Sequence, residues 1–335
     1  MPQAAPTPDR PPLHLKGGYL AIASPESVSE ACFSVPAVRA IRNARPQGTI
    51  VVVANQDTAP VWRKVTEINL VIEHGSADSA RKIARLLNEC DVPFDSSIAW
   101  EDSPAAQAFA KAGIHQRLGY PSEKLAKSLT DPVEVVRKIG PIEHQVNHYL
   151  LFVEKLGAEP FTPSNFTPPP RPKPPQTFLI AVAPGSDYGS ASEWPLERFS
   201  EFVGELANHC DVAILPSPDQ PGPAAALAKS LGDPTLNLGL EGDALLDFLA
   251  TCNGLIACDG SVPHLASFVG TPSLVFFGPN EPEWRRPLGR IHRILRHHVP
   301  CSGCLLNKCP LDHRCMDEIT IPEALDEIRA LFERG

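Results

Sequence analysis

Short apolar runs alternate with segments of helical spacing along most of the chain. In the first half the apolar runs predict strands at residues 20–24, 49–54, 68–72, 96–100 and 116–120. Apolar positions spaced three and four apart predict helices at residues 26–43, 77–88, 105–112 and 143–156. Strands that alternate with helices are typical of a parallel, doubly wound sheet.

The same alternation starts again after residue 177. Strands are predicted at residues 178–184, 211–215, 235–238, 255–258, 273–277 and 291–296, and helices at residues 196–208, 224–231, 243–252, 262–269 and 322–332. Between the two halves lies the proline-rich segment FTPSNFTPPPRPKPPQT, which favours an extended spacer because proline interrupts helices and central strands. The predicted organisation is therefore a disordered proline-rich tail, an N-terminal domain, a linker and a C-terminal domain, at residues 1–17, 18–160, 161–177 and 178–335.

Composition narrows the class of protein. The chain has 335 residues, is 43% hydrophobic and has a formal net charge of −9. This acidic balance excludes a general nucleic-acid binder, which needs a basic face. No uninterrupted apolar run approaches the roughly 20 residues that span a bilayer, and the N-terminus lacks the apolar segment of a signal peptide. We therefore expect a cytoplasmic protein.

The segment GLIACDGSVPHLASFVGTPSLVFFGP, residues 254–279, reads as strand, tight turn, helix and strand. In such a unit, ligands lie beyond the carboxyl ends of the strands, and the first turn of the helix favours an anion. Asp259, Gly260, Ser261 and His264 occupy this turn. Two plainer interpretations remain open: Asp259 is a helix cap, and His264 is an ordinary core histidine.

Three further places are candidates for chemistry. Gly185 and Ser186 end the strand FLIAVAP, where backbone amides and a hydroxyl suit a phosphate, or where a simple turn is enough. Arg285 and Arg286 follow the loop after residue 277, and paired guanidinium donors suit a diphosphate, although adjacent arginines are also common on solvated surfaces. Glu30 lies in the first turns of the helix at 26–43, either as a base toward the interdomain cleft or as a residue favoured by the helix dipole.

Taken together, these segments resemble glycosyltransferase family 9, the ADP-heptose:lipopolysaccharide heptosyltransferases. The similar motifs are PGS at 184–186, WPLERF at 194–199, DGSVPHLA at 259–266, GTPSLVFFGPNEP at 270–282 and CSGC…CP…CM at 301–316, with looser ones at 35–41, 94–103, 117–121 and 144–157. The resemblance implies an α/β GT-B fold, in which two Rossmann-like, doubly wound parallel-sheet domains face a cleft. It also implies inversion at the anomeric carbon without a metal cofactor, with the nucleotide-sugar donor on the C-terminal domain and the acceptor on the N-terminal domain.

Residue by residue, the resemblance implies one catalytic group and a set of donor-binding groups. Glu30 stands where the family has its aspartate general base. The donor-binding groups would be Gly185, Ser186 and Ser192 near phosphate, Leu240 against the base, and Asp259, Gly260, Ser261 and His264 around the diphosphate and sugar.

Three positions depart from the family's pattern. Gly260-Ser261 reverses the usual order of hydroxyl residue and glycine, and Glu30 is one methylene longer than aspartate. Ser192-Glu193 stands where the family has lysine and a second basic residue before Trp-Pro. The last change replaces a cation that pairs with phosphate by a hydroxyl and a carboxylate, so donor affinity is expected to depend on another arginine.

Four cysteines are clustered near the end of the sequence. Cys301, Cys304, Cys309 and Cys315 are spaced C-x2-C-x4-C-x5-C. Four cysteines suit a tetrahedral zinc, but a structural zinc site usually pairs two C-x2-C knuckles and only one is present. We expect reduced, packed thiols and no metal, with zinc as the alternative.

The sequence as a whole predicts an inverting glycosyltransferase that moves a heptose or related sugar from a nucleotide sugar, with ADP-heptose the expected donor. The expected acceptor is a lipopolysaccharide core or similar amphiphilic glycan, which implies transient contact with the inner membrane face. Two alternatives stay open: a catalytically degenerate nucleotide- or glycan-binding module, and a nucleotide-sugar epimerase.

Overall fold

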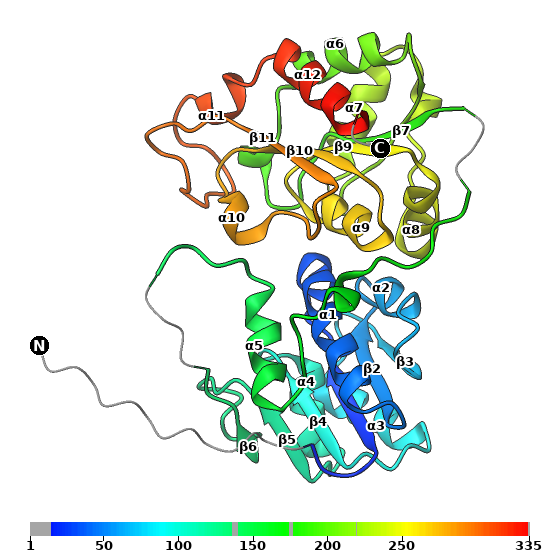
Figure 1. Ribbon diagram of the computed structural model, residues 1–335, viewed down its shortest axis with the longest axis vertical. Coiled ribbons are helices and arrows are strands. Elements are labelled where there is room, and N and C mark those ends of the chain that lie inside the picture. The colour runs from blue at the N-terminus through cyan, green and yellow to red at the C-terminus, as the bar shows by residue number, and fades with distance from the viewer. Residues whose placement is uncertain (1–14, 136–139, 174–176, 219, 334–335) are drawn as a thin grey trace, which may run out of the picture.

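The computed structural model describes residues 15–135, 140–173, 177–218 and 220–333. Two parallel sheets, each covered by helices, lie one above the other along the long axis of the molecule (Figure 1). The predicted α/β fold is confirmed in both halves. Most of the predicted tail, residues 1–14, is outside the described residues, and the chain is already packed at Leu15, which is buried in the core.

The N-terminal sheet has the strand order β3-β2-β1-β4-β5-β6, with every pairing parallel. Its strands are β1 (Tyr19–Ala23), β2 (Thr49–Asn55), β3 (Leu70–His74), β4 (Ser96–Ala99), β5 (Gln116–Gly119) and β6 (Asp131–Pro132). The central strands are apolar on both faces, as expected for a sheet covered by helices on both sides. The covering helices are α1 (Val28–Ala44), α2 (Ala59–Arg63), α3 (Ala80–Glu89), α4 (Pro104–Lys111) and α5 (Asn147–Lys155).

The C-terminal sheet has the order β11-β10-β9-β7-β8, again fully parallel. Its strands are β7 (Leu179–Ala183), β8 (Asp211–Ile214), β9 (Gly254–Cys258), β10 (Ser273–Phe277) and β11 (His292–Arg296). The α-helices of this half are α6 (Leu196–Leu206), α7 (Gly222–Ser230), α8 (Gly242–Thr251), α9 (Ser261–Val269), α10 (Pro282–Arg285), α11 (Arg314–Asp317) and α12 (Ile321–Phe332). Short 3-10 turns occur at η1 (Pro163–Phe166), η2 (Ser190–Ser192) and η3 (Pro234–Leu236).

Helix α1 lies between the two domains and is buried almost all round from Ser29 to Ile41. It packs against α5 in its own domain and against α9 in the other, and the Phe33 ring lies 4.8 Å from the His264 ring. Its buried polar residues are Ser29, Ser34 and Arg39, and the other buried positions of α1 are apolar. This helix thereby fixes Glu30 at the boundary of the two domains.

The described part of the proline-rich segment is fastened to both domains. Arg39 of α1 donates to the carbonyls of Asn165 and Thr167, at 3.2 and 2.5 Å. Arg171 donates to the carbonyls of Ala250 and Gly270, each at 3.2 Å, in the C-terminal domain. Arg39 therefore binds carbonyl groups of the segment, whereas Arg171 of the segment binds carbonyl groups of the C-terminal domain.

Two sequence predictions were wrong in detail. Residues 235–238 do not form a strand: the 3-10 turn η3 is there, and only a single bridge joins Asn237 to Ile214. Asp233 caps that turn by accepting the Thr235 N–H at 2.9 Å, so its local bonding replaces a ladder. The helix expected from 143 begins at Asn147, because Gln145 uses its N–H to reach the carbonyl of Trp284 in the other domain, at 2.7 Å.

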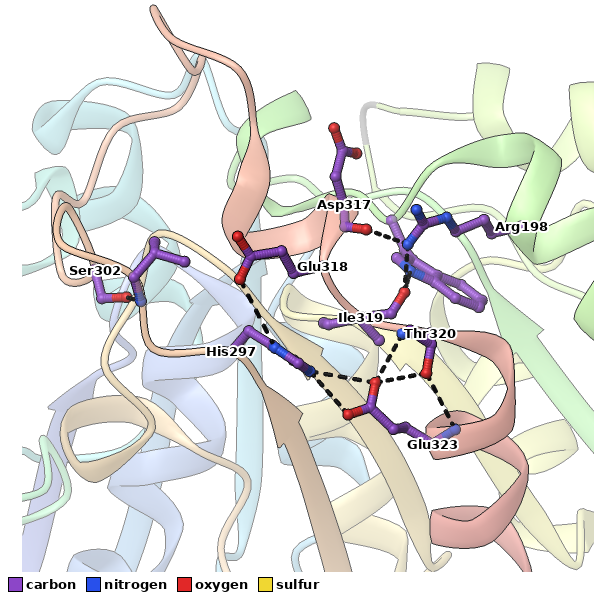
Figure 2. A network of polar contacts seen from close by, with 10 residues as sticks. Arg198, His297, Ser302, Asp317, Glu318, Ile319, Thr320 and Glu323 are labelled. Atoms are coloured by element: carbon purple, nitrogen blue, oxygen red, sulfur yellow. Dashed lines mark hydrogen bonds and ion pairs between the residues drawn. The ribbon is translucent and has the colours of Figure 1, made fainter.

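The C-terminal segment is fastened to the second domain by a polar network around His297 and the start of α12 (Figure 2). His297 Nε2 lies 3.1 Å from Glu323 Oε1, and Glu323 forms a capping box with Thr320. Arg198 of α6 donates to the carbonyls of Asp317 and Ile319. The network brackets residues 298–316, the cysteine-rich segment, at both ends. No helix among the described residues combines the length and hydropathy needed to cross a membrane.

Candidate active site

A cleft of about 660 Å³ lies where the carboxyl ends of strands from both sheets meet. This is the edge at which doubly wound sheets bind ligands. Its wall includes residues that follow β1, β2, β7, β8 and β9. The lining residues are Glu26, Ser27, Val28, Gln56, Asp57, Pro60, Val61, Asp187, Pro216, Ser217, Pro218, Leu240, Glu241, Gly242, Leu245, Leu246, Ser261 and Leu265. Two of the predicted donor residues, Leu240 and Ser261, are in this wall.

Glu30 is half-buried beside the cleft, in the first turn of α1. Its Oε2 accepts a hydrogen bond from the Tyr149 hydroxyl of α5 at 2.5 Å. Burial raises the pKa of Glu30 above its usual value, and the Tyr149 hydrogen bond and the charge of Arg285 oppose that rise. The carboxylate is thus aligned by a tyrosine and kept at the interface between domains, where a general base would be needed.

Asp259 ends β9 and is almost completely buried. Asn280, from the loop after β10, donates to its Oδ2 at 2.5 Å. Burial raises the pKa of Asp259 to about 7, against the opposing effects of Asn280 and the Arg285 charge. The hydrogen bond links the residues that follow β9 and β10. Because its pKa is near 7, the Asp259 carboxyl is only partly ionised at neutral pH.

The N-terminus of α9 is occupied by a carboxylate of the chain itself. Asp187 Oδ1 accepts the Ser261 N–H at 2.7 Å, and Oδ2 accepts the Ser261 hydroxyl. Gly260 leaves room for this contact, since a Cβ there would lie 2.8 Å from Asp187 Oδ1 and would displace the carboxylate. An internal anion therefore sits at the helix end that the sequence predicted for phosphate.

The loop after β7 is also closed by internal hydrogen bonds. Ser186 is fully buried, and its hydroxyl donates to the carbonyl of Asp259 at 2.6 Å. Its N–H donates to Glu193 Oε1 at 3.2 Å. Gly185 packs toward Pro223 and accepts the Ser217 hydroxyl at 2.6 Å. Ser192 is buried in η2 and is not part of the cleft wall.

His264 lies apart from the cleft wall. It is 1% exposed, and neither ring nitrogen has a hydrogen-bond partner in the described structure. It lines a second, smaller cavity of about 230 Å³ between α1, α9 and η1. Burial lowers the pKa of His264 well below its usual value, so the ring is neutral.

The cysteine-rich segment contacts two loops near the site. The Ala191 N–H donates to the carbonyl of Asn307 at 3.1 Å, and the Leu305 N–H donates to the carbonyl of Pro279 at 3.0 Å. These contacts brace the loop after β7 and the loop that presents Asn280. The described residues contain no group of three or more His, Cys, Asp or Glu side chains arranged to hold a metal ion.

Sequence reasoning missed Asp187, Tyr188 and Tyr149. The residue type and place of Asp187 were a usable signal, because an aspartate just after a strand end can cap a neighbouring helix. Tyr149 offered no such signal, since its contact with Glu30 spans 119 positions of the chain.

Two Rossmann-like domains that face a cleft along their strand ends define the GT-B architecture of glycosyltransferases. The sequence model of glycosyltransferase family 9 (heptosyltransferase) matches residues 90–314. The chain belongs to this family and is a glycosyltransferase, as its motifs predicted.

Known relatives are distant in sequence and close in fold. Lipopolysaccharide heptosyltransferase 2 of Escherichia coli (strain K12) is 22% identical over 352 aligned positions, covering 93% of this chain and 97% of the relative. The glycosyltransferase family 9 structure from Veillonella parvula DSM 2008 has a TM-score of 0.80 at 15% identity, covering 97% of this chain and 99% of that one. E. coli heptosyltransferase WaaC with ADP-2-deoxy-2-fluoro heptose has a TM-score of 0.66 at 16% identity, covering 93% and 99%. At such identities the structures establish the fold alone.

Proposed function

We propose that this glycosyltransferase moves a heptose from a nucleoside diphosphate sugar, with ADP-heptose as the expected donor, to a lipopolysaccharide core or related amphiphilic glycan. Membership of a heptosyltransferase family supports the sugar, and the relative crystallised with an ADP-heptose analogue supports the donor. The observation on which the proposal depends is the position of Glu30. Its carboxylate comes from one domain and lies within electrostatic range of Arg285 in the other, beside a cleft that both domains line.

In the proposed reaction Glu30 takes the proton of an acceptor hydroxyl as the oxygen attacks the anomeric carbon. A new C–O bond forms on one face of the sugar while the bond to the diphosphate breaks on the other, so the configuration inverts. The electron pair leaves with the nucleoside diphosphate, and the proton remains on Glu30 until it is released to water. Tyr149 holds the carboxylate in one orientation throughout.

The cleft volume falls in the usual range for small-molecule sites, about 300–1,000 Å³. We assign the nucleoside to the part of the wall that contains Leu240, with the diphosphate toward Ser261 and Asp259. The acceptor would enter from the N-terminal domain, and its amphiphilic character would bring the protein transiently to the cytoplasmic face of the inner membrane. No metal is assigned a part in this mechanism.

One observation favours a binding module without catalysis. Glu193 and Asp187 accept the N–H groups of Ser186 and Ser261, two groups expected to face a diphosphate. The variant Glu30→Gln separates the two functions. In an enzyme, losing a general base lowers turnover about 10²- to 10⁴-fold, while affinity for ADP or UDP measured by titration calorimetry changes little.

The matched control is Glu89→Gln, an exposed glutamate at the end of α3. Wild-type protein that binds ADP but transfers no heptose to a core acceptor would establish the binding module instead. Incubation with the donor alone tests the epimerase alternative, because an epimerase forms product without an acceptor.

A further inference from the structure

Arg285 forms no ion pair with any carboxylate of the described residues. It ends the short helix α10, is half-buried, and its guanidinium carbon lies 4.0 Å from the centre of the Tyr188 ring. Its Nε is buried and has no hydrogen-bond partner, and no carboxylate of the described residues lies within 4.0 Å of its guanidinium. Most buried polar nitrogens are paired, so this one has unused capacity to bind an anion.

The surroundings of Arg285 place it at the reacting end of the site. Its charge acts on Glu30 of the N-terminal domain and on Asp259 at the end of β9, where in both cases it opposes the larger effect of burial on the pKa. Tyr188, on which it stacks, directly follows Asp187 of the cleft wall. Arg285 therefore lies next to the cleft, between the candidate base and the turn at the start of α9.

The described residues that line the cleft supply no positive charge. Its wall contains four carboxylates, Glu26, Asp57, Asp187 and Glu241, and no lysine or arginine among the described residues that line it. The loop at residues 184–193, PGSDYGSASE, also lacks a basic residue. Glu193, which stands where the family resemblance expects a basic residue, accepts the Ser186 N–H instead. A diphosphate bound here needs its counter-charge from outside both segments.

We propose that Arg285 binds the β-phosphate of the donor and supplies the positive charge that Ser192 and Glu193 no longer supply. The inference rests on the proposed function, since it names a residue for the same site. The β-phosphate is the one joined to the anomeric carbon, and Glu30 must reach the hydroxyl that attacks that carbon, so the group nearest Glu30 is the β-phosphate. Stacking on Tyr188 keeps the planar guanidinium in a fixed orientation, which suits paired donation to phosphate oxygens.

Titration calorimetry with ADP and AMP, on the full chain, tests this assignment. Arg285→Gln should weaken ADP binding about 10- to 100-fold, the range expected for one or two charge-assisted hydrogen bonds, and leave AMP binding within about twofold. Arg285→Lys keeps the charge without the planar fork and should weaken ADP binding less than the glutamine variant does. Arg81→Gln is the matched control, because Arg81 is an exposed arginine of α3 outside the site.

Each outcome decides the assignment. ADP affinity within twofold of wild type in Arg285→Gln overturns it, provided that thermal melting shows a folded variant; Arg285→Lys serves the same purpose if the glutamine variant does not fold. A rise in acceptor KM with unchanged ADP affinity also overturns it and assigns Arg285 to an anionic acceptor. If wild-type protein binds neither ADP nor UDP, the proposed function fails first, and the assignment fails with it.

Discussion

The carboxylate of Asp187 accepts both the backbone N–H and the hydroxyl of Ser261, across 74 positions of the chain. It thereby holds the first turn of α9 in the manner of an N-cap, although it comes from a different loop. In a family that binds nucleoside diphosphates, this contact places a negative charge where a phosphate is expected. The donor must displace Asp187 or bind beside it.

Asp187→Ala should bind ADP more tightly than wild type, by about tenfold, equivalent to about 1.4 kcal/mol. The Ser261 N–H and hydroxyl become free for a phosphate, and one repelling charge is removed. The same variant should be less stable by about 0.5–2 kcal/mol, the usual effect of losing a cap. Calorimetry and urea unfolding measure the two effects, with the exposed Asp326→Asn as control. Unchanged ADP affinity would contradict a phosphate at this helix end.

Tyr149→Phe should shift the acid limb of the pH–rate profile to higher pH. Burial raises the pKa of Glu30, and the Tyr149 hydrogen bond holds that pKa down. Without the hydroxyl the pKa rises further, and Glu30 must be deprotonated to act as a base, so activity is lost at a higher pH than in wild type. Profiles of kcat/KM against pH provide the measurement, and Tyr19→Phe, at an exposed tyrosine, should leave the profile in place.

Asp259 should make the protein less stable as pH rises from about 4 to 7. Burial raises its pKa to about 7 in the folded state, whereas the unfolded chain loses this proton near pH 4. Between these values the folded state binds the extra proton, so the free energy of unfolding falls with increasing pH by up to about 1.4 kcal/mol per unit. Besides burial, the hydrogen bond from Asn280 and the charge of Arg285 lower this pKa, and the charge of Asp187 raises it.

Asp259→Asn removes this contribution. Relative to wild type, the variant should gain about 1–3 kcal/mol in free energy of unfolding between pH 5 and pH 7, measured by urea unfolding at the two values. Asp326→Asn should follow the wild-type curve. Parallel curves for wild type and Asp259→Asn would show that the pKa of Asp259 is close to its unfolded value.

Gly189→Ala should lower the stability of the fold. Gly189 has a φ of 105°, and a Cβ there would lie 2.3 Å from the carbonyl oxygen of Asn307. The substitution must separate the loop after β7 from the cysteine-rich segment, at a cost of about 1–3 kcal/mol for the strained backbone alone. Gly232→Ala is a matched control, since its φ is 77° and no atom lies within 4 Å of the added carbon. If both variants melt alike, the contact with Asn307 has no effect on stability.

Chelation should leave turnover unchanged. Within the part of the chain that the structure describes, no group of three or more His, Cys, Asp or Glu side chains is arranged to hold a metal ion, and the proposed reaction assigns no step to one. Activity assayed before and after treatment with EDTA, together with metal analysis of the purified protein, measures this. A full equivalent of zinc whose removal lowers the melting temperature would instead indicate a structural metal site.

The fold was predictable where hydrophobic pattern alone decides it. Strand β10 lies at the predicted residues, β1 differs from the prediction by one residue at each end, and β9 differs by one residue at its start. Fully buried parallel strands produce the continuous apolar runs on which these predictions depend. The strand predicted at residues 235–238 was wrong, since a short apolar run between turns does not distinguish a strand from a 3-10 turn. The short helices α2 and α10 were missed because a single turn carries no periodic signal.

The sequence predicted which residues follow the strand ends at the candidate site, but not which residues are their hydrogen-bond partners. Ser261 lies in the cleft wall and Asp259 directly precedes the turn that leads to it, because topology brings strand ends together; Glu30 lies beside the cleft, and its role stays a prediction. The partners of these residues, Tyr149, Asn280 and Asp187, come from loops and helices whose approach depends on tertiary packing. His264 was expected near the donor and lies instead against Phe33, in a second cavity, because the whole of α9 is buried between domains.

The direct packing of α1 on α9 also bears on how a reactive donor is protected. In the proposed reaction the base comes with α1, whereas the diphosphate is held by the domain of α9 and α10. If the domains separated to admit substrate, Glu30 would move away from the anomeric carbon, and no group would remain there to activate a water molecule. A water molecule that reached the donor while the domains were apart would then meet no base, so futile hydrolysis of the sugar nucleotide is limited to the arrangement in which α1 packs on α9.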